Sequence, residues 1–76
     1  MERMSAKAVV ALVRAIRPLL AGHHPANQGG ALADLTATWL AGYSPGARED
    51  FLALQVETIR KLVPVNEGSR GKGRAF

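Results

Sequence analysis

The segment Ser44–Val63, SPGAREDFLALQVETIRKLV, constrains the chain more than any other, because its start, its end and its apolar face all indicate one helix. Ser44 is a favoured N-cap residue, since its hydroxyl accepts a hydrogen bond from a free backbone N–H, and Pro45 suits the first helical position. Pro64 has no N–H to donate and disfavours helical geometry just before it. The sequence therefore predicts a helix over 45–63.

The apolar face of this predicted helix is unusually wide. At about 100° per residue, its apolar side chains spread over roughly 200° of the circumference. The remaining arc is charged, and Glu57 and Lys61 are spaced to form an i, i+4 ion pair. One neighbouring helix cannot cover so wide a face, so we expect two packing partners. The predicted interface, which includes residues of the preceding segment, consists of Leu35, Trp39, Tyr43, Phe51, Leu52, Val56, Ile59 and Val63.

The length of the chain makes self-association a reasonable way to cover that face. With 76 residues there is room for one domain. A domain of this size buries only about 60% of the surface that its unfolded chain exposes, and small domains usually need disulfides, a metal or oligomerisation. The sequence contains no cysteine, which excludes disulfides. We therefore expect a homo-oligomer, with a dimer favoured.

A first helix is predicted over about 5–21. Ser5 is a plausible N-cap, and the aliphatic residues that follow it fall in one arc of about 100°. Basic residues gather on another face of the same helix. Pro18 lies within the pattern and is expected to kink the helix or end it early. Gly22 fits the left-handed position that commonly follows a helix.

A second helix is predicted over 25–41, with Gln28, Leu32, Leu35 and Trp39 on one face. Two adjacent glycines at 29–30 cost about 2 kcal/mol against alanines in a helix interior, so a start near Ala31 is the alternative. The link to the third helix is short, which favours antiparallel neighbours. The predicted fold is all-α: a three-helix domain over 1–63, in which helices two and three form an antiparallel hairpin.

The basic residues provide a second functional hypothesis. Residues 64–76 carry half of the net charge of +4 and are rich in glycine, so we predict a disordered basic tail. Together with the basic face of the first helix, the tail would suit a polyanion, because such side chains neutralise phosphates without reading sequence. The candidate polyanion-binding residues are Arg3, Lys7, Arg14, Arg17, Arg70, Lys72 and Arg74.

No residue pattern predicts catalysis, a cofactor or a metal. His23 and His24 are adjacent on a predicted loop, and no cysteine or second histidine cluster completes a metal site. The glycines at 29–30 near a helix start suggest an anion pocket, but the lysine and Ser/Thr of a phosphate loop are missing. Asp34 is the only acid between Glu2 and Glu49, so no paired carboxylates are available for acid–base chemistry.

The remaining expectations concern membranes and location. No apolar run approaches the roughly 18 residues that predict a transmembrane helix, and no convincing secretory cleavage site follows the apolar run 8–13. The first helix is amphipathic and could lie on an anionic membrane, but it lacks aromatic residues and its aliphatic side chains are needed for a core. We therefore expect a cytoplasmic protein without a membrane role.

These observations favour a small, non-enzymatic helical module for protein–protein interaction or assembly. We expect it to act as a homo-oligomer, and a different protein is the other possible partner. The alternative is a nucleic-acid-binding accessory protein that uses the basic face of the first helix and the basic tail. An enzyme would need a site assembled between subunits around His23, His24 and Asp34.

Overall fold

Three helices joined by two short turns make up the computed structural model, which describes residues 5–70 and 76, with the backbone alone at 69 and 70. The helices are α1 (Ala6–Leu20), α2 (Pro25–Ala41) and α3 (Pro45–Arg70). No strand occurs within the described part of the chain. The predicted all-α class is therefore confirmed, as is contact between α2 and α3.

The helix starts follow the predicted chemistry. The backbone N–H of Ala8 donates to Ser5 Oγ at 3.2 Å, and that of Ala47 donates to Ser44 Oγ at 3.4 Å. For α2 the cap is His24, whose Nδ1 accepts from Ala26 N at 3.0 Å. This cap places the start of α2 at Pro25, so the alternative start near Ala31 is wrong.

The two turns differ in how they end a helix. Gly22 has φ of +82°, the left-handed conformation that glycine adopts without a steric penalty, and it follows the α1 cap residue Ala21. Gly42 ends α2 with an ordinary right-handed backbone, φ −74°. Pro18 does not end α1, which continues for two more residues to Leu20.

The end of α3 corrects the sequence prediction. The helix continues through Pro64 to Arg70, whereas the sequence predicted an end at Leu62 or Val63 and a disordered tail from 64. A proline has a helical φ of about −65°, so a helix can pass through it when the lost hydrogen bond is compensated. The carbonyl that loses its donor at Pro64 is that of Arg60. Beyond the proline, Asn66 Nδ2 donates to the Leu62 carbonyl at 3.0 Å, a bond within the last turns of α3. Residues 71–75 of the predicted tail lie outside the described residues.

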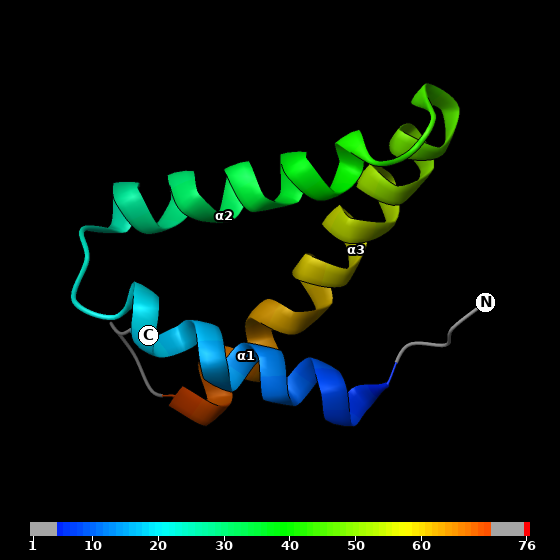
Figure 1. Cartoon of the computed structure of the whole chain (residues 1–76). Coiled ribbons are helices and arrows are strands. Elements are labelled where there is room, and N and C mark those ends of the chain that lie inside the picture. Colours follow the sequence, from blue (N-terminus) through cyan, green and yellow to red (C-terminus); the bar gives the residue numbers. More distant parts are fainter. Residues whose placement is uncertain (1–4, 71–75) are drawn as a thin grey trace.

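The helices form an open arrangement (Figure 1). α2 and α3 meet at the turn that joins them and then diverge, and α3 crosses toward α1 at its far end. The radius of gyration is 13.8 Å, against about 11 Å expected for a compact chain of this length. The three helices therefore touch mainly near their ends and leave much of their length free of one another.

Candidate interaction surface

The first point of contact joins the end of α1 to the start of α2. Leu20 and Gln28 are the most buried side chains of the described residues, each with 9% of its surface exposed. Gln28 Nε2 donates to the carbonyl oxygen of Leu20 at 2.9 Å. This carbonyl is in the last turn of α1, where carbonyls lack partners within the helix. The same carbonyl also accepts from the backbone N–H of His23 at 3.2 Å, so the buried glutamine adds a second bond to it and joins the start of α2 to the end of α1.

The second point of contact is the hairpin between α2 and α3. The ring of Tyr43 lies 4.6 Å from that of Phe51, and Trp39 lies 5.9 Å from each, all measured between ring centroids. Such separations are within the range of favourable aromatic pairs. Arg48 adds a polar tie, since its Nε and Nη2 donate to the carbonyls of Leu40 and Ala41, both at 3.2 Å. The guanidinium thereby caps the carboxyl end of α2 from α3.

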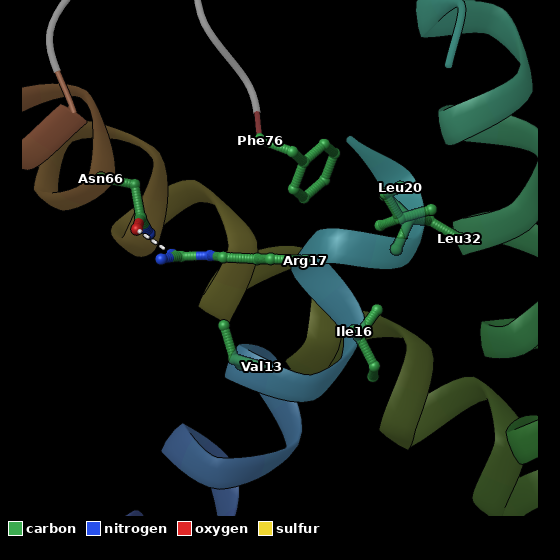
Figure 2. A pocket seen from close by; sticks show the side chains of 7 residues that line it. All are labelled: Val13, Ile16, Arg17, Leu20, Leu32, Asn66 and Phe76. Atoms are coloured by element: carbon green, nitrogen blue, oxygen red, sulfur yellow. Dashed lines mark hydrogen bonds between the residues drawn. The ribbon is translucent and has the colours of Figure 1, made fainter. Parts of the chain in front are cut away.

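The third point of contact links α1 to the far end of α3 and borders a cavity of about 360 Å³. Figure 2 shows Arg17 reaching from α1 to Asn66, with Nη2 donating to Oδ1 at 3.3 Å. The ring of Phe76 lies over the same space. The cavity is lined by Val13, Ile16, Arg17, Leu20, Leu32, Asn66 and Phe76. The side chains that line it are mostly apolar, and none of them is Asp or Glu. The cavity could therefore accept an apolar group, but its lining does not indicate a catalytic site.

Between these contacts the helices expose most of their apolar side chains. Among the described residues, Leu20 is the one large apolar side chain that is buried. The chain exposes 6615 Å² of surface, whereas a compact monomer of 8.1 kDa exposes about 4,500 Å². Soluble monomers rarely leave contiguous apolar surface of more than a few hundred Å² uncovered. The many large apolar side chains exposed on all three helices are therefore a candidate interaction surface.

The predicted interface residues divide into two groups in the structure. Trp39, Tyr43 and Phe51 form the aromatic contact between α2 and α3, although Trp39 keeps 41% of its surface exposed. The second group is exposed, and on α3 it comprises Leu52, Val56, Ile59 and Val63, with Leu35 on α2. The structure brings the first group together within the chain and leaves the second group free to contact another molecule. That the second group forms an interface stays a prediction.

The predicted polyanion-binding residues are only partly described. Lys7 and Arg14 are exposed on α1, and Arg17 is half-buried against Asn66. The side chain of Arg70 lies outside the described part, as do Arg3, Lys72 and Arg74. The structure therefore places two exposed basic side chains on one helix and engages the third in a contact within the chain.

The two histidines have separate surroundings. His24 Nδ1 accepts the hydrogen bond that begins α2, whereas His23 borders a small cavity of about 150 Å³ with Leu19 and Gln28. Where the chain is described, no three His, Cys, Asp or Glu side chains gather in an arrangement able to hold a metal ion. The histidine pair and Asp34 do not form one site within this chain.

Three contacts were not predicted from sequence: the Gln28 bond to α1, the Arg48 cap on α2 and the Arg17–Asn66 link. Each joins a side chain to a group on a different helix. The position of Gln28 on the apolar face of α2 was a usable signal, because a polar side chain there needs a partner. The Glu57–Lys61 pair was predicted from its spacing and is confirmed, with Nζ and Oε1 3.4 Å apart.

Comparisons of the chain with protein-family models, with curated proteins and with solved structures find no match. Across the described residues, none of the helices combines the length and the hydropathy needed to span a bilayer. Any functional hypothesis must therefore be argued from the surface itself.

Proposed function

We propose that this chain is a small, non-enzymatic, cytoplasmic assembly module, which forms a homodimer through its exposed helical faces. One observation carries the proposal: the surface of 6615 Å² exceeds that of a compact monomer by about 2,100 Å². Obligate homodimers bury about 2,000–5,000 Å² in total, or about half of that on each chain. The excess on one chain is thus of the size that a dimer covers.

Packing within the monomer gives further support. Among the described side chains, the helices are joined by the Gln28 bond at α1–α2, the Arg17 bond at α1–α3, and the Arg48 bonds and the three-ring aromatic contact at α2–α3. Net hydrogen-bond contributions are about 1 kcal/mol each, which is small beside the conformational entropy of ordering the chain. A second copy that covers the apolar faces would supply the missing burial.

The solution mass, measured by light scattering over a range of concentrations and at two salt levels, tests this proposal. The expected result is a mass near twice 8.1 kDa that persists at high salt, because screening weakens charge pairs far more than apolar burial. A mass of 8.1 kDa at every concentration contradicts self-assembly.

A second candidate function, binding of nucleic acid, is favoured by the charges of α1. This helix contains Lys7, Arg14 and Arg17 and no acid, whereas the acids of the described chain lie on α2 and α3. A salt-sensitive mobility shift of labelled DNA or RNA tests it. Lys7→Glu combined with Arg14→Glu should abolish that shift, and a shift unaffected by the double change would place any binding elsewhere.

A further inference from the structure

One face of α3 carries a regular apolar seam, defined here as Leu52, Val56, Ile59 and Val63. The four residues follow one another at intervals of four, three and four positions. At about 100° per residue they lie within an arc of about 60°, which is the width of a coiled-coil stripe. Valines occupy the positions equivalent to a, and leucine and isoleucine those equivalent to d, so the seam has the alternating four- and three-residue apolar spacing of a coiled coil.

The seam is not used within the chain. Its four side chains keep between 39% and 57% of their surface exposed, with Val56 the least and Val63 the most exposed. The half-buried residues of α3 lie on an adjacent face and include Phe51, Gln55 and Asn66. Phe51 contacts Trp39 of α2 and Asn66 contacts Arg17 of α1, so the contacts of α3 within the chain are made from the face beside the seam, and the seam side chains themselves keep a large exposed fraction.

We infer that the seam of one chain pairs with the seam of a second copy, an inference that rests on the proposed homodimer. When the same seam of two copies pairs, the interface has two-fold symmetry: a residue that contacts a second seam position on the other copy is matched by the reverse contact. Such an interface is closed, so assembly stops at two chains. The exposed surface in excess of a compact monomer, about 2,100 Å², is larger than the roughly 800 Å² per partner of a standard interface. A second copy is therefore an occupant of adequate size.

The charges of α3 favour an antiparallel pair. Glu49 lies near its start and Arg60 in its second half, and at about 100° per residue both flank the seam on the same side. A parallel pair would place the acids beside the same acids and the bases beside the same bases, which is unfavourable, and it would also align the helix dipoles. In the antiparallel register Leu52 faces Val63 of the second copy. The acidic start of α3 in each copy then lies toward the basic second half of α3 in the other.

Cysteine cross-linking tests both the face and the direction, and the cysteine-free sequence makes every cross-link attributable to an introduced residue. Leu52→Cys mixed with Val63→Cys should give a disulfide-linked mixed dimer under mild oxidation. Leu52→Cys alone should form its disulfide at least roughly tenfold more slowly than the mixture does. In an antiparallel pair the two copies of residue 52 are about 16 Å apart, well beyond the reach of a disulfide.

Leu54→Cys is the matched control. Leu54 is 59% exposed on the same helix and lies on the side opposite the seam, so it reports random collision. Efficient self-linking of Leu52→Cys would overturn the antiparallel inference in favour of a parallel pair. Seam variants that link no faster than Leu54→Cys, in a protein that light scattering shows to be dimeric, would overturn the seam and leave the proposed homodimer intact. A monomeric wild-type protein would overturn the homodimer itself.

Discussion

At the scale of the residue, the glycines show how conformation and space set the effect of a substitution. Gly22 has a positive φ, so a side chain there is strained whatever room surrounds it. Gly30 lies inside α2 with helical backbone, and a Cβ added to it would meet nothing within 4 Å. The two positions therefore respond to alanine in opposite directions.

Gly30→Ala should stabilise the fold by about 1 kcal/mol, because alanine loses less backbone entropy than glycine in a helix. Gly22→Ala should destabilise it by about 1 kcal/mol, because the left-handed conformation crowds Cβ. Urea unfolding followed by circular dichroism measures both. Equal effects of the two substitutions would contradict the backbone assignment of the first turn.

Gln28→Glu tests the buried bond between α1 and α2. The carboxylate keeps the shape of the amide but cannot donate to the Leu20 carbonyl, 2.9 Å away, and it brings an uncompensated charge into a buried position. We expect a loss of about 2 kcal/mol or more in the free energy of unfolding. Gln28→Ala, which removes the donor without adding a charge, is the control and should cost less. A neutral effect of the glutamate would show that this contact does not hold the helices together.

At the scale of the element, helix starts and turns were predictable, whereas the end of α3 was not. Ser5, Ser44 and Gly22 act through their own backbone neighbourhood, so local sequence is sufficient to identify their roles. Beyond Pro64 the helix carries Asn66, which bonds both to its own helix and to Arg17, 49 positions earlier. The predicted tail boundary was misplaced because Pro64 indicates a helix end, and a contact between residues so far apart in the sequence has no local signature that could have opposed it.

The Arg17–Asn66 link should therefore couple α1 to the last turns of α3. In a double-mutant cycle with Arg17→Ala and Asn66→Ala, we expect a coupling free energy of about 0.5–1 kcal/mol, which is modest because the bond is long and only part-buried. Arg14→Ala paired with Asn66→Ala is the matched control, since Arg14 is exposed on α1 and should show no coupling. If the effects of the substitutions are additive in both cycles, Arg17 and Asn66 are not coupled, and their hydrogen bond does not help to stabilise the last turns of α3.

At the scale of the whole molecule, the sequence led us to predict a partner for the chain. It did not indicate which apolar residues would contact one another within the chain and which would stay exposed. The wide apolar arc of α3 was evident from periodicity. Which part of that arc contacts α2 depends on the angle between the helices, and side-chain pattern alone does not determine that angle. The aromatic residues Trp39, Tyr43 and Phe51 were predicted in the interface but contact one another within the chain.

If assembly completes the core, thermal stability should depend on protein concentration. The melting temperature of the wild-type chain should rise with concentration, because dissociation accompanies unfolding. Ile59→Glu should remove that dependence by placing a charge in the seam, and Leu54→Glu, on the opposite side of α3, should retain it. An Ile59→Glu variant as stable and as associated as the parent would contradict a role for this face.

The aromatic contact at the hairpin also gives the molecule its own optical reporter. Trp39 is the sole tryptophan of the chain, it is 41% exposed, and its ring lies 5.9 Å from both Tyr43 and Phe51. Its emission wavelength therefore depends on whether α2 and α3 are closed against each other and on how much water reaches the indole. Closing of the hairpin can thus be followed by intrinsic fluorescence in the unmodified protein, without any attached dye.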